Sequence, residues 1–291
     1  MAVEATVFKA GWTLDDIQWS KFDASKVDPE LLATVKGAAL VEYNAPDYVA
    51  YLKRVFKNSG ARALADIEQW GVEETQHGRA LGRWAEMADP AFRLDESLAR
   101  FRKGYRAPHF ASTAETSVRG SRRGEMIARC VVESGTSSYY SALRESTDEP
   151  VLKEIAGRIA ADEFRHYKLF FETLNVQDEP DISFWKKLMV AIGRVNESDD
   201  DELAYAYYCA NVPVDREASV PYRRQACVKA YQAKTVSLYR RHHVRKLVQM
   251  VAKAIGANPQ SRMTEWAGAL AWHAMRLRAA HSRAAASKVP A

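Results

Sequence analysis

Two helical hairpins of matched length are the strongest constraint that the sequence places on the fold. The tetrads Glu74–His77 and Glu163–His166 each hold a Glu followed three residues later by a His, and a further Glu precedes each tetrad by about 30 residues. A turn-forming segment lies near the middle of each interval, "KNSGA" at 57–61 and "STDEP" at 146–150. Near-equal arms bring residues of antiparallel helices to the same height, so the spacing predicts a four-helix bundle with six residues at mid-height. These six are Glu42, Glu74, His77, Glu133, Glu163 and His166.

The composition agrees with an all-α chain. Gly (14) and Pro (10) are sparse among 291 residues, 47% of residues are hydrophobic, and no series of alternating β-branched runs is present. We expect an irregular N-terminal arm over 1–28 and a single helical domain over 29–291, with a bundle core at about 29–175 and extra helices at about 182–283. The expected helices span about 28–58, 61–87, 115–146, 150–174, 182–195, 199–211, 217–256 and 262–283, and 89–115 is expected to be a basic connection.

The sequence gives general indications of the protein's localisation and of the kind of partner that it binds. The first residues lack a basic start followed by an apolar run, and no run approaches the roughly 20 apolar residues of a membrane span. The three cysteines are widely spaced and match no zinc pattern, which favours a soluble protein of a reducing cytoplasm. A net charge of +5 suits any acidic partner, and no nucleic-acid-binding motif accompanies it.

The six residues point to a metal site. Residues three apart share one helix face, so each tetrad presents a carboxylate and an imidazole together, among mostly apolar neighbours. Four carboxylates buried side by side could not all stay ionised without cations, and two divalent ions supply the matching charge. Carboxylate and imidazole ligands with open positions suit iron or manganese better than structural zinc. One Glu from each of two helices with Glu-x-x-His from the other two is the ligand set of ferritin-like di-iron carboxylate bundles.

The segments around these ligands resemble the soluble acyl-acyl-carrier-protein desaturases. "WGVEETQHG" at 70–78 is similar to the family's W-x-x-E-E-x-x-H-G, and "IAADEFRH" at 159–166 to its I-A-A-D-E-x-R-H. "EYNAPDY" at 42–48 resembles E-x-x-x-P-x-Y, and "ESGT" at 133–136 keeps a Glu with a Thr three residues later. The matches cover about 35–175, in the family's order and spacing.

The resemblance implies an oxidoreductase of fatty acid biosynthesis that uses O₂ and a ferredoxin-type electron donor to desaturate an acyl chain on acyl carrier protein. It implies two iron ions (Fe²⁺/Fe³⁺) and a homodimer. By position, Glu42 and His77 would ligate one iron, Glu133 and His166 the other, and Glu74 and Glu163 would bridge them. Three further roles are implied: Thr136 would assist proton handling at the oxygen site, Asp162 would orient a histidine, and Trp70 would lie near the cluster.

Departures from the family pattern keep other activities open. Gln76 replaces the usual Arg, Ser134-Gly135 differs from the common pair, and Tyr140 lies on the ligand face one turn beyond Thr136, where it would line the cavity or tune the oxidant. The alternatives are a hydroxylase or N-oxygenase, a non-catalytic iron-binding protein, or a metal-free scaffold with buried ion pairs. Pro46 predicts a helix kink just after Glu42.

Basic clusters are the remaining sequence feature. They lie at 100–106, 119–125 and 239–246, and each is either solvated surface or a docking patch for acidic acyl carrier protein.

Overall fold

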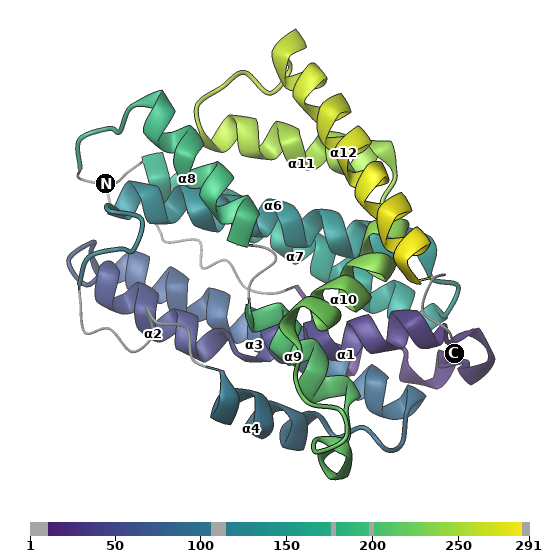
Figure 1. The fold of residues 1–291 in the computed structure, drawn as a ribbon. Helices are drawn as coiled ribbons and strands as arrows, with labels where there is room; N and C mark the ends of the chain where they lie inside the picture. The colour runs from purple at the N-terminus through teal and green to yellow at the C-terminus, as the bar shows by residue number, and fades with distance from the viewer. Residues whose placement is uncertain (1–10, 106–114, 176–178, 198–200, 287–291) are drawn as a thin grey trace.

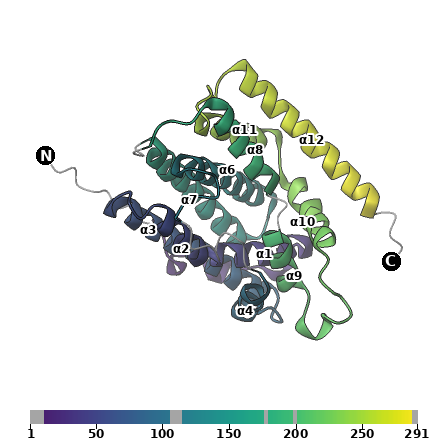
Figure 2. The same cartoon turned by 60° about the vertical axis from the view of Figure 1, so that its left-hand side comes forward.

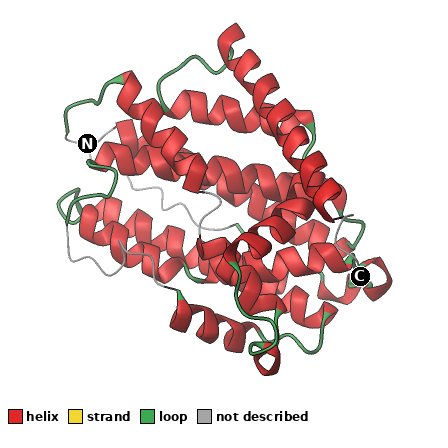
Figure 3. Cartoon of the chain, viewed as in Figure 1, coloured by secondary structure: helices red, strands yellow, loops and turns green. Residues whose placement is uncertain are grey.

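All regular elements in the described part of the chain are helices. The computed structural model describes residues 11–105, 115–175, 179–197 and 201–286, and within these ranges it contains no strand (Figure 3). The all-α prediction is therefore confirmed for the described residues. No helix in these ranges combines the length and the apolar character that crossing a bilayer would need.

Four long helical segments run side by side at the centre of the molecule (Figure 1). The first is divided into α1 (Pro29–Tyr43) and α2 (Ala45–Val55), and it packs along α3 (Ala61–Ala88). The second pair consists of α6 (Arg122–Ser146) and α7 (Pro150–Asn175), which pack along each other, and α3 also contacts α7. The two hairpins expected from the Glu and His spacing are thus both formed.

The predicted kink after Glu42 is present. Helix α1 ends at Tyr43, and Asn44 leaves helical geometry with φ −84° and ψ 3°. Pro46 occupies the first turn of α2, where its missing N–H costs no helix hydrogen bond. The side chain of Arg102 donates from Nε to Oδ1 of Asn44 at 3.1 Å, which holds the break in place.

Three predicted boundaries are wrong. The expected connection 89–115 contains α4 (Leu94–Gly104), an amphipathic helix that buries Leu94, Leu98 and Phe101 on one face. Helix α6 begins at Arg122 rather than near 115, because the hydroxyl of Ser121 accepts the N–H of Gly124 and caps it there.

The expected helix 217–256 is two helices, α10 (Arg224–Leu238) and α11 (Arg241–Ala254). Tyr239 and Arg240 are extended between them. The N–H of Arg240 donates to Nδ1 of His243, so a side chain rather than the preceding helix satisfies this donor.

The outer helices cover two sides of the central four. Helices α9 (Asp201–Asn211) and α10 pack on α1, whereas α8 (Phe184–Asn196) and α11 pack on α6. Helix α12 (Arg262–Ala286) lies on the outside of the molecule against α10 and α11 (Figure 2). The arm between residues 11 and 28 forms short 3₁₀ turns at Leu14–Asp16, Trp19–Lys21 and Ala24–Lys26, as expected of an irregular segment.

The apolar core is divided into two clusters, and the six acidic and imidazole residues lie between them. Along each central helix, residues of one cluster come before the candidate ligands and residues of the other come after. Representative members are Leu40, Leu81, Tyr140 and Ile159 on one side and Leu52, Trp70, Cys130 and Phe170 on the other. The fold therefore places a polar layer at mid-height inside an apolar interior.

Candidate metal centre

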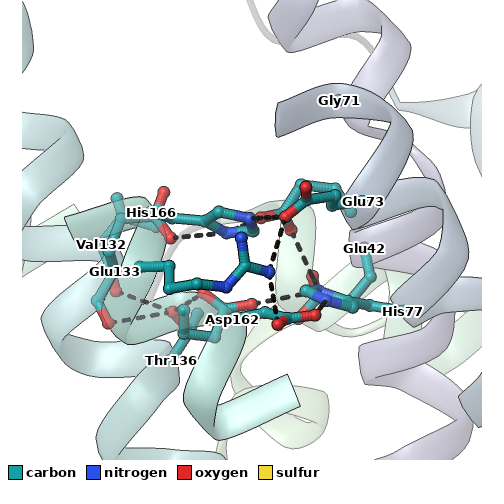
Figure 4. Close-up of polar contacts among 12 residues, drawn as sticks. Glu42, Gly71, Glu73, His77, Val132, Glu133, Thr136, Asp162 and His166 are labelled. Carbon is teal, nitrogen blue, oxygen red and sulfur yellow. Dashed lines mark hydrogen bonds and ion pairs between the residues drawn. The ribbon is translucent and has the colours of Figure 1, made fainter. Parts of the chain in front are cut away.

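The six predicted ligands converge in this polar layer. Figure 4 shows four of them, Glu42, His77, Glu133 and His166. Each of the six is at most 8% exposed. Their donor atoms form two groups, within each of which all atoms lie within 4.8 Å of one another, and Glu74 and Glu163 belong to both. The groups are Glu42, Glu74, His77 and Glu163, and Glu74, Glu133, Glu163 and His166. Two carboxylates shared between two otherwise separate donor sets are suited to two neighbouring cations.

A glycine allows the helices to approach closely beside the ligands. A Cβ added to Gly78 would lie 2.5 Å from the backbone nitrogen of Tyr43 and 2.8 Å from the carbonyl oxygen of Ala39. Because Gly78 follows His77 and Tyr43 follows Glu42, this contact fixes the separation of two ligands. Only a residue without a side chain permits it.

The imidazoles turn their Nδ1 atoms towards the carboxylates. Nδ1 of His77 lies 3.3 Å from Oε1 of Glu163 and 4.0 Å from Oε2 of Glu42. Nδ1 of His166 lies 2.9 Å from Oε1 of Glu74 and 3.7 Å from Oε2 of Glu133. Both rings thus direct one nitrogen into the centre and the other away from it.

Several donor atoms of the centre are buried without a hydrogen bond. These include Nδ1 of His77, Oε1 of Glu133 and Oε1 of Glu163. Nδ1 of His166 and Oε1 of Glu74 also lack hydrogen-bond geometry, despite their short separation. Buried polar atoms are rarely left unsatisfied, so atoms that converge in this way fit cation ligation. Four carboxylates and two imidazoles are a donor set for iron or manganese.

The carboxylates differ in their affinity for protons. Burial, followed by the charges of Glu74 and Glu163, raises the pKa of Glu42 well above its usual range. Burial and the charge of Glu163 likewise raise the pKa of Glu133. Burial also opposes ionisation of Glu74, but the neighbouring side chains of His166 and Glu42 outweigh it and lower its pKa to about 2.

The imidazoles hold protons tightly in the absence of cations. Burial lowers the pKa of His77, but the neighbouring carboxylates of Asp162 and Glu163 outweigh it and raise that pKa to about 9. Burial also lowers the pKa of His166. The neighbouring carboxylates, Glu133 first, outweigh burial and raise that pKa well above its usual range. The cation-free site therefore balances its charge with protons, and cations must displace them.

A crossed set of hydrogen bonds orients both imidazoles. Nε2 of His77 lies 3.0 Å from Oδ2 of Asp162, on the opposite hairpin, and Nε2 of His166 lies 2.8 Å from Oε2 of Glu73. Nη2 of Arg165 joins the two carboxylates, 2.5 Å from Oδ1 of Asp162 and 3.0 Å from Oε2 of Glu73. Each outer nitrogen is held by a carboxylate from the other hairpin, which leaves Nδ1 as the ligand atom.

The structure places Asp162 where the resemblance implied, but the motifs led to no predicted role for Glu73 and Arg165, although both residues lie within them. A signal was present, because both tetrads are directly preceded by an acidic residue, in "EETQH" at 73–77 and "DEFRH" at 162–166. An acid that repeats at one offset from two paired ligands is a candidate for their outer hydrogen bonds.

The N-terminal arm also reaches the centre, through Trp12. This side chain is buried, and its Nε1 donates to Oδ2 of Asp162 at 2.7 Å. Its ring stacks on His77, with centroids 6.1 Å apart and planes 8° apart. The side chain of Gln76, which departs from the family pattern, donates to the carbonyl oxygen of Trp12 at 3.0 Å. No sequence signal indicated that an irregular arm would complete the surroundings of His77.

The structure brings Trp70 near His166 rather than into the ligand layer. The two residues line a small cavity between α3 and α7 together with Glu73 and Arg165. The ring of Trp70 meets Phe170 edge-on at 5.6 Å, and its Nε1 is buried without a hydrogen-bond partner.

Thr136 and Tyr140 each contact a different carboxylate of the centre. The hydroxyl of Thr136 reaches Oε2 of Glu163 and also lies 3.3 Å from the carbonyl oxygen of Glu133. The hydroxyl of Tyr140 donates to Oε1 of Glu42 at 2.5 Å. Both residues predicted beside the ligands on α6 are therefore in contact with them.

A second cluster of Glu and His lies at the surface and differs from the buried centre. Oε1 of Glu145 lies 3.1 Å from Nε2 of His242 and 3.3 Å from Nε2 of His243. Nδ1 of His243 accepts the N–H of Arg240, so the proton of the neutral ring resides on Nε2 and faces Glu145. A ring that presents N–H offers no lone pair there, and the cluster is better described as a hydrogen-bonded cap of α11.

The predicted basic clusters are partly engaged in ion pairs within the chain. Nε of Arg100 lies 2.5 Å from Glu217, Arg119 forms two close contacts with Glu197, and Nε of Arg122 lies 3.0 Å from Glu179. These arginines contribute less free positive charge than the sequence suggests.

Comparison with known proteins adds no relative. No protein-family model matches the chain, and no curated protein matches it significantly. Function is therefore inferred from the residues of the centre and from their geometry.

Proposed function

We propose that this chain is a ferritin-like di-iron oxidoreductase that desaturates an acyl chain carried on acyl carrier protein, with O₂ and a ferredoxin-type electron donor. The observation that carries the proposal is the pair of buried donor groups that share Glu74 and Glu163. The motif resemblance over about 35–175 supports the desaturase branch among di-iron proteins.

In this proposal, Glu42 and His77 would hold one iron, and Glu133 and His166 would hold the other. Glu74 and Glu163, which belong to both donor groups, would be shared between them. The four carboxylates then balance the charge of two ferrous ions. A reduced iron pair supplies the reduction of O₂ and an oxidant that can remove hydrogen from an unactivated methylene.

The chain's own residues keep the imidazoles ready for the metal. Asp162 and Glu73 each accept the Nε2–H of a histidine, so Nδ1 is the nitrogen that can bind a cation once its own proton is displaced. Arg165 binds both carboxylates and keeps them ionised and in place. Thr136 can pass a proton between the centre and its surroundings, because its hydroxyl reaches Oε2 of Glu163.

An apolar interior suits an acyl substrate. The ligand layer lies between two apolar clusters, which keep water from the centre and supply the kind of side chains that would line a channel for a saturated chain. The methylene that reacts is then selected by its position relative to the centre, since all methylenes of the chain are chemically alike.

A basic surface on α7 and α11 supports docking of an acidic carrier protein. The ammonium groups of Lys168 and Lys246 both lie over the ring of Phe164, and that of Lys253 lies over Phe171. Lys246 belongs to the predicted basic cluster at 239–246. Positive charge of this kind steers an acidic partner.

The proposal is tested by product analysis. Iron-loaded protein is given saturated acyl chains of several lengths on acyl carrier protein, isotopically labelled O₂ and a reduced ferredoxin system. Loss of two hydrogens from the chain, with no label in the product, is the expected result. Label in the product would instead establish a hydroxylase or N-oxygenase. Iron oxidation without any change in the substrates would indicate a non-catalytic iron-binding protein.

A further inference from the structure

A buried phenol lies one hydrogen bond from a proposed iron ligand. Tyr140 is 1% exposed, and its hydroxyl donates to Oε1 of Glu42 at 2.5 Å. The other oxygen of Glu42 is the one that faces Nδ1 of His77. Glu42 can therefore ligate a cation with Oε2 while Oε1 remains bonded to the phenol.

This arrangement is suited to oxidation of the phenol. Removal of one electron makes a phenol a strong acid, so its oxidation becomes accessible only where a base takes the proton at once. Oε1 of Glu42 is such a base and is already in hydrogen-bond contact. Trp70 is also near the centre, but its buried Nε1–H has no acceptor, so its oxidation lacks this assistance.

We propose that Tyr140 is a redox-active residue that reduces the iron pair by one electron when O₂ has oxidised it and no acyl chain is bound. The proposal rests on the proposed function, which supplies the iron pair. Tyr140 gives one electron to the irons and its hydroxyl proton to Oε1 of Glu42, and a neutral phenoxyl radical remains. A one-electron reductant, such as the ferredoxin-type donor of the proposed function, returns an electron to the phenoxyl radical, and the proton returns from Glu42 to the phenol. The net effect removes one oxidising equivalent from the centre without damage to the chain.

The test uses the full chain loaded anaerobically with ferrous ion and then exposed to O₂ without substrate. Samples are frozen for electron paramagnetic resonance, and ferrous oxidation is followed optically in parallel. We expect an organic radical whose signal narrows when the protein is grown with ring-deuterated tyrosine. The signal is expected to be lost in Tyr140→Phe, and iron content and ferrous oxidation are measured in the same samples so that the radical is compared at equal iron content.

Tyr51→Phe is the matched control. Tyr51 is also buried, and its hydroxyl donates to a carboxylate, Oε2 of Glu125, at 2.7 Å, but that carboxylate is not a proposed ligand. The radical should persist in this variant. A radical retained in Tyr140→Phe, or lost equally in Tyr51→Phe, would overturn the assignment.

Unaltered protein that binds and oxidises iron but forms no radical would overturn the redox role of Tyr140 and leave the proposed function standing. Failure to bind iron at all would remove both.

Discussion

The two hairpins supply the same ligand types but surround them differently. Helix α6 passes through Glu133 without interruption, whereas the first hairpin is broken at Asn44, directly after Glu42. Oε1 of Glu42 accepts a hydrogen bond from the hydroxyl of Tyr140, whereas Oε1 of Glu133 has no hydrogen bond.

The outer supports of the two histidines differ as well. Asp162, which holds His77, also accepts from Trp12 of the N-terminal arm, whereas Glu73, which holds His166, accepts from Gln69 of its own helix.

The comparison indicates that the ligand sets determine whether metal binds, whereas the residues around the ligands determine what the bound metal does. Equal ligand sets give each half a place for one cation, which is a property of the duplicated spacing. The surroundings of the two candidate cation positions then differ. The position at Glu42 and His77 contacts the hydroxyl of Tyr140 and, through Asp162, Trp12 of the N-terminal arm, whereas the position at Glu133 keeps an oxygen without a hydrogen bond. We therefore expect O₂ and substrate on the Glu133 side and electron exchange with Tyr140 on the Glu42 side.

The largest expected effect comes from the carboxylates that both halves share. Glu74→Ala should abolish binding of both irons, because it removes a donor from each group. Glu133→Ala removes a donor from one group alone. This variant should bind about one iron per chain, against about two in the unaltered protein. Anaerobic ferrous titration measures both. Equal losses in the two variants would contradict the division into two overlapping sites.

Metal affinity should rise steeply with pH. The pKa of His77 is raised to about 9 without metal, so at about pH 7 the ring holds a proton that the cation must displace. Affinity should increase about tenfold per pH unit for each proton released, and should level off once the pH exceeds the pKa of that group. Calorimetry in two buffers of different ionisation enthalpy counts the protons. Binding without proton release would show that the imidazoles are already neutral.

Substitution of Asp162 or Glu73, the carboxylates that bind the outer nitrogens of the histidines, should reduce metal affinity less than loss of a ligand does. Asp162→Asn and Glu73→Gln should each weaken metal binding by about 10- to 100-fold, because each removes the anion that orients one imidazole. Asp162→Asn should also loosen the arm, since Trp12 donates to this residue. Glu68→Gln is the control, because Glu68 is an exposed acid of α3 that is paired with Lys53. An effect of the control equal to that of either variant would point to general electrostatics instead.

The smallest expected effect concerns the contact between α3 and α1. Gly78→Ala should destabilise the metal-free protein by about 1–3 kcal/mol, because the added Cβ meets the backbone of Tyr43. Gly193→Ala, in α8, meets nothing within 4 Å and should instead stabilise by about 0.5–1 kcal/mol. Urea unfolding measures both. A neutral Gly78→Ala would mean that the two backbones can separate without cost.

The candidate site was predictable from local spacing, whereas its surroundings were not. The six ligands follow from helix periodicity and near-equal hairpin arms, and the kink follows from the missing N–H of Pro46. Trp12 could not be placed in this way, because it lies in an irregular arm and meets Asp162 only through tertiary packing.

The same limit applies to the wrong helix boundaries. The start of α6 depends on the cap by Ser121, and the break before α11 depends on a hydrogen bond from the backbone of Arg240 to His243. Both segments read as continuous helices from composition. Helix α4 could have been predicted, because Leu94, Leu98 and Phe101 recur at helical spacing on one face. The basic residues of this stretch led us to predict a connection instead.

Metal content, measured together with an optical spectrum, tests the two-iron centre most directly. The protein is purified in air and compared with Glu163→Ala, which lacks a carboxylate of both donor groups. We expect about two irons per chain with near-ultraviolet absorption of an oxo-bridged pair, and loss of both in the variant. Unaltered protein that contains no iron and refuses added ferrous ion would contradict the metal centre and leave the six residues as buried ion pairs.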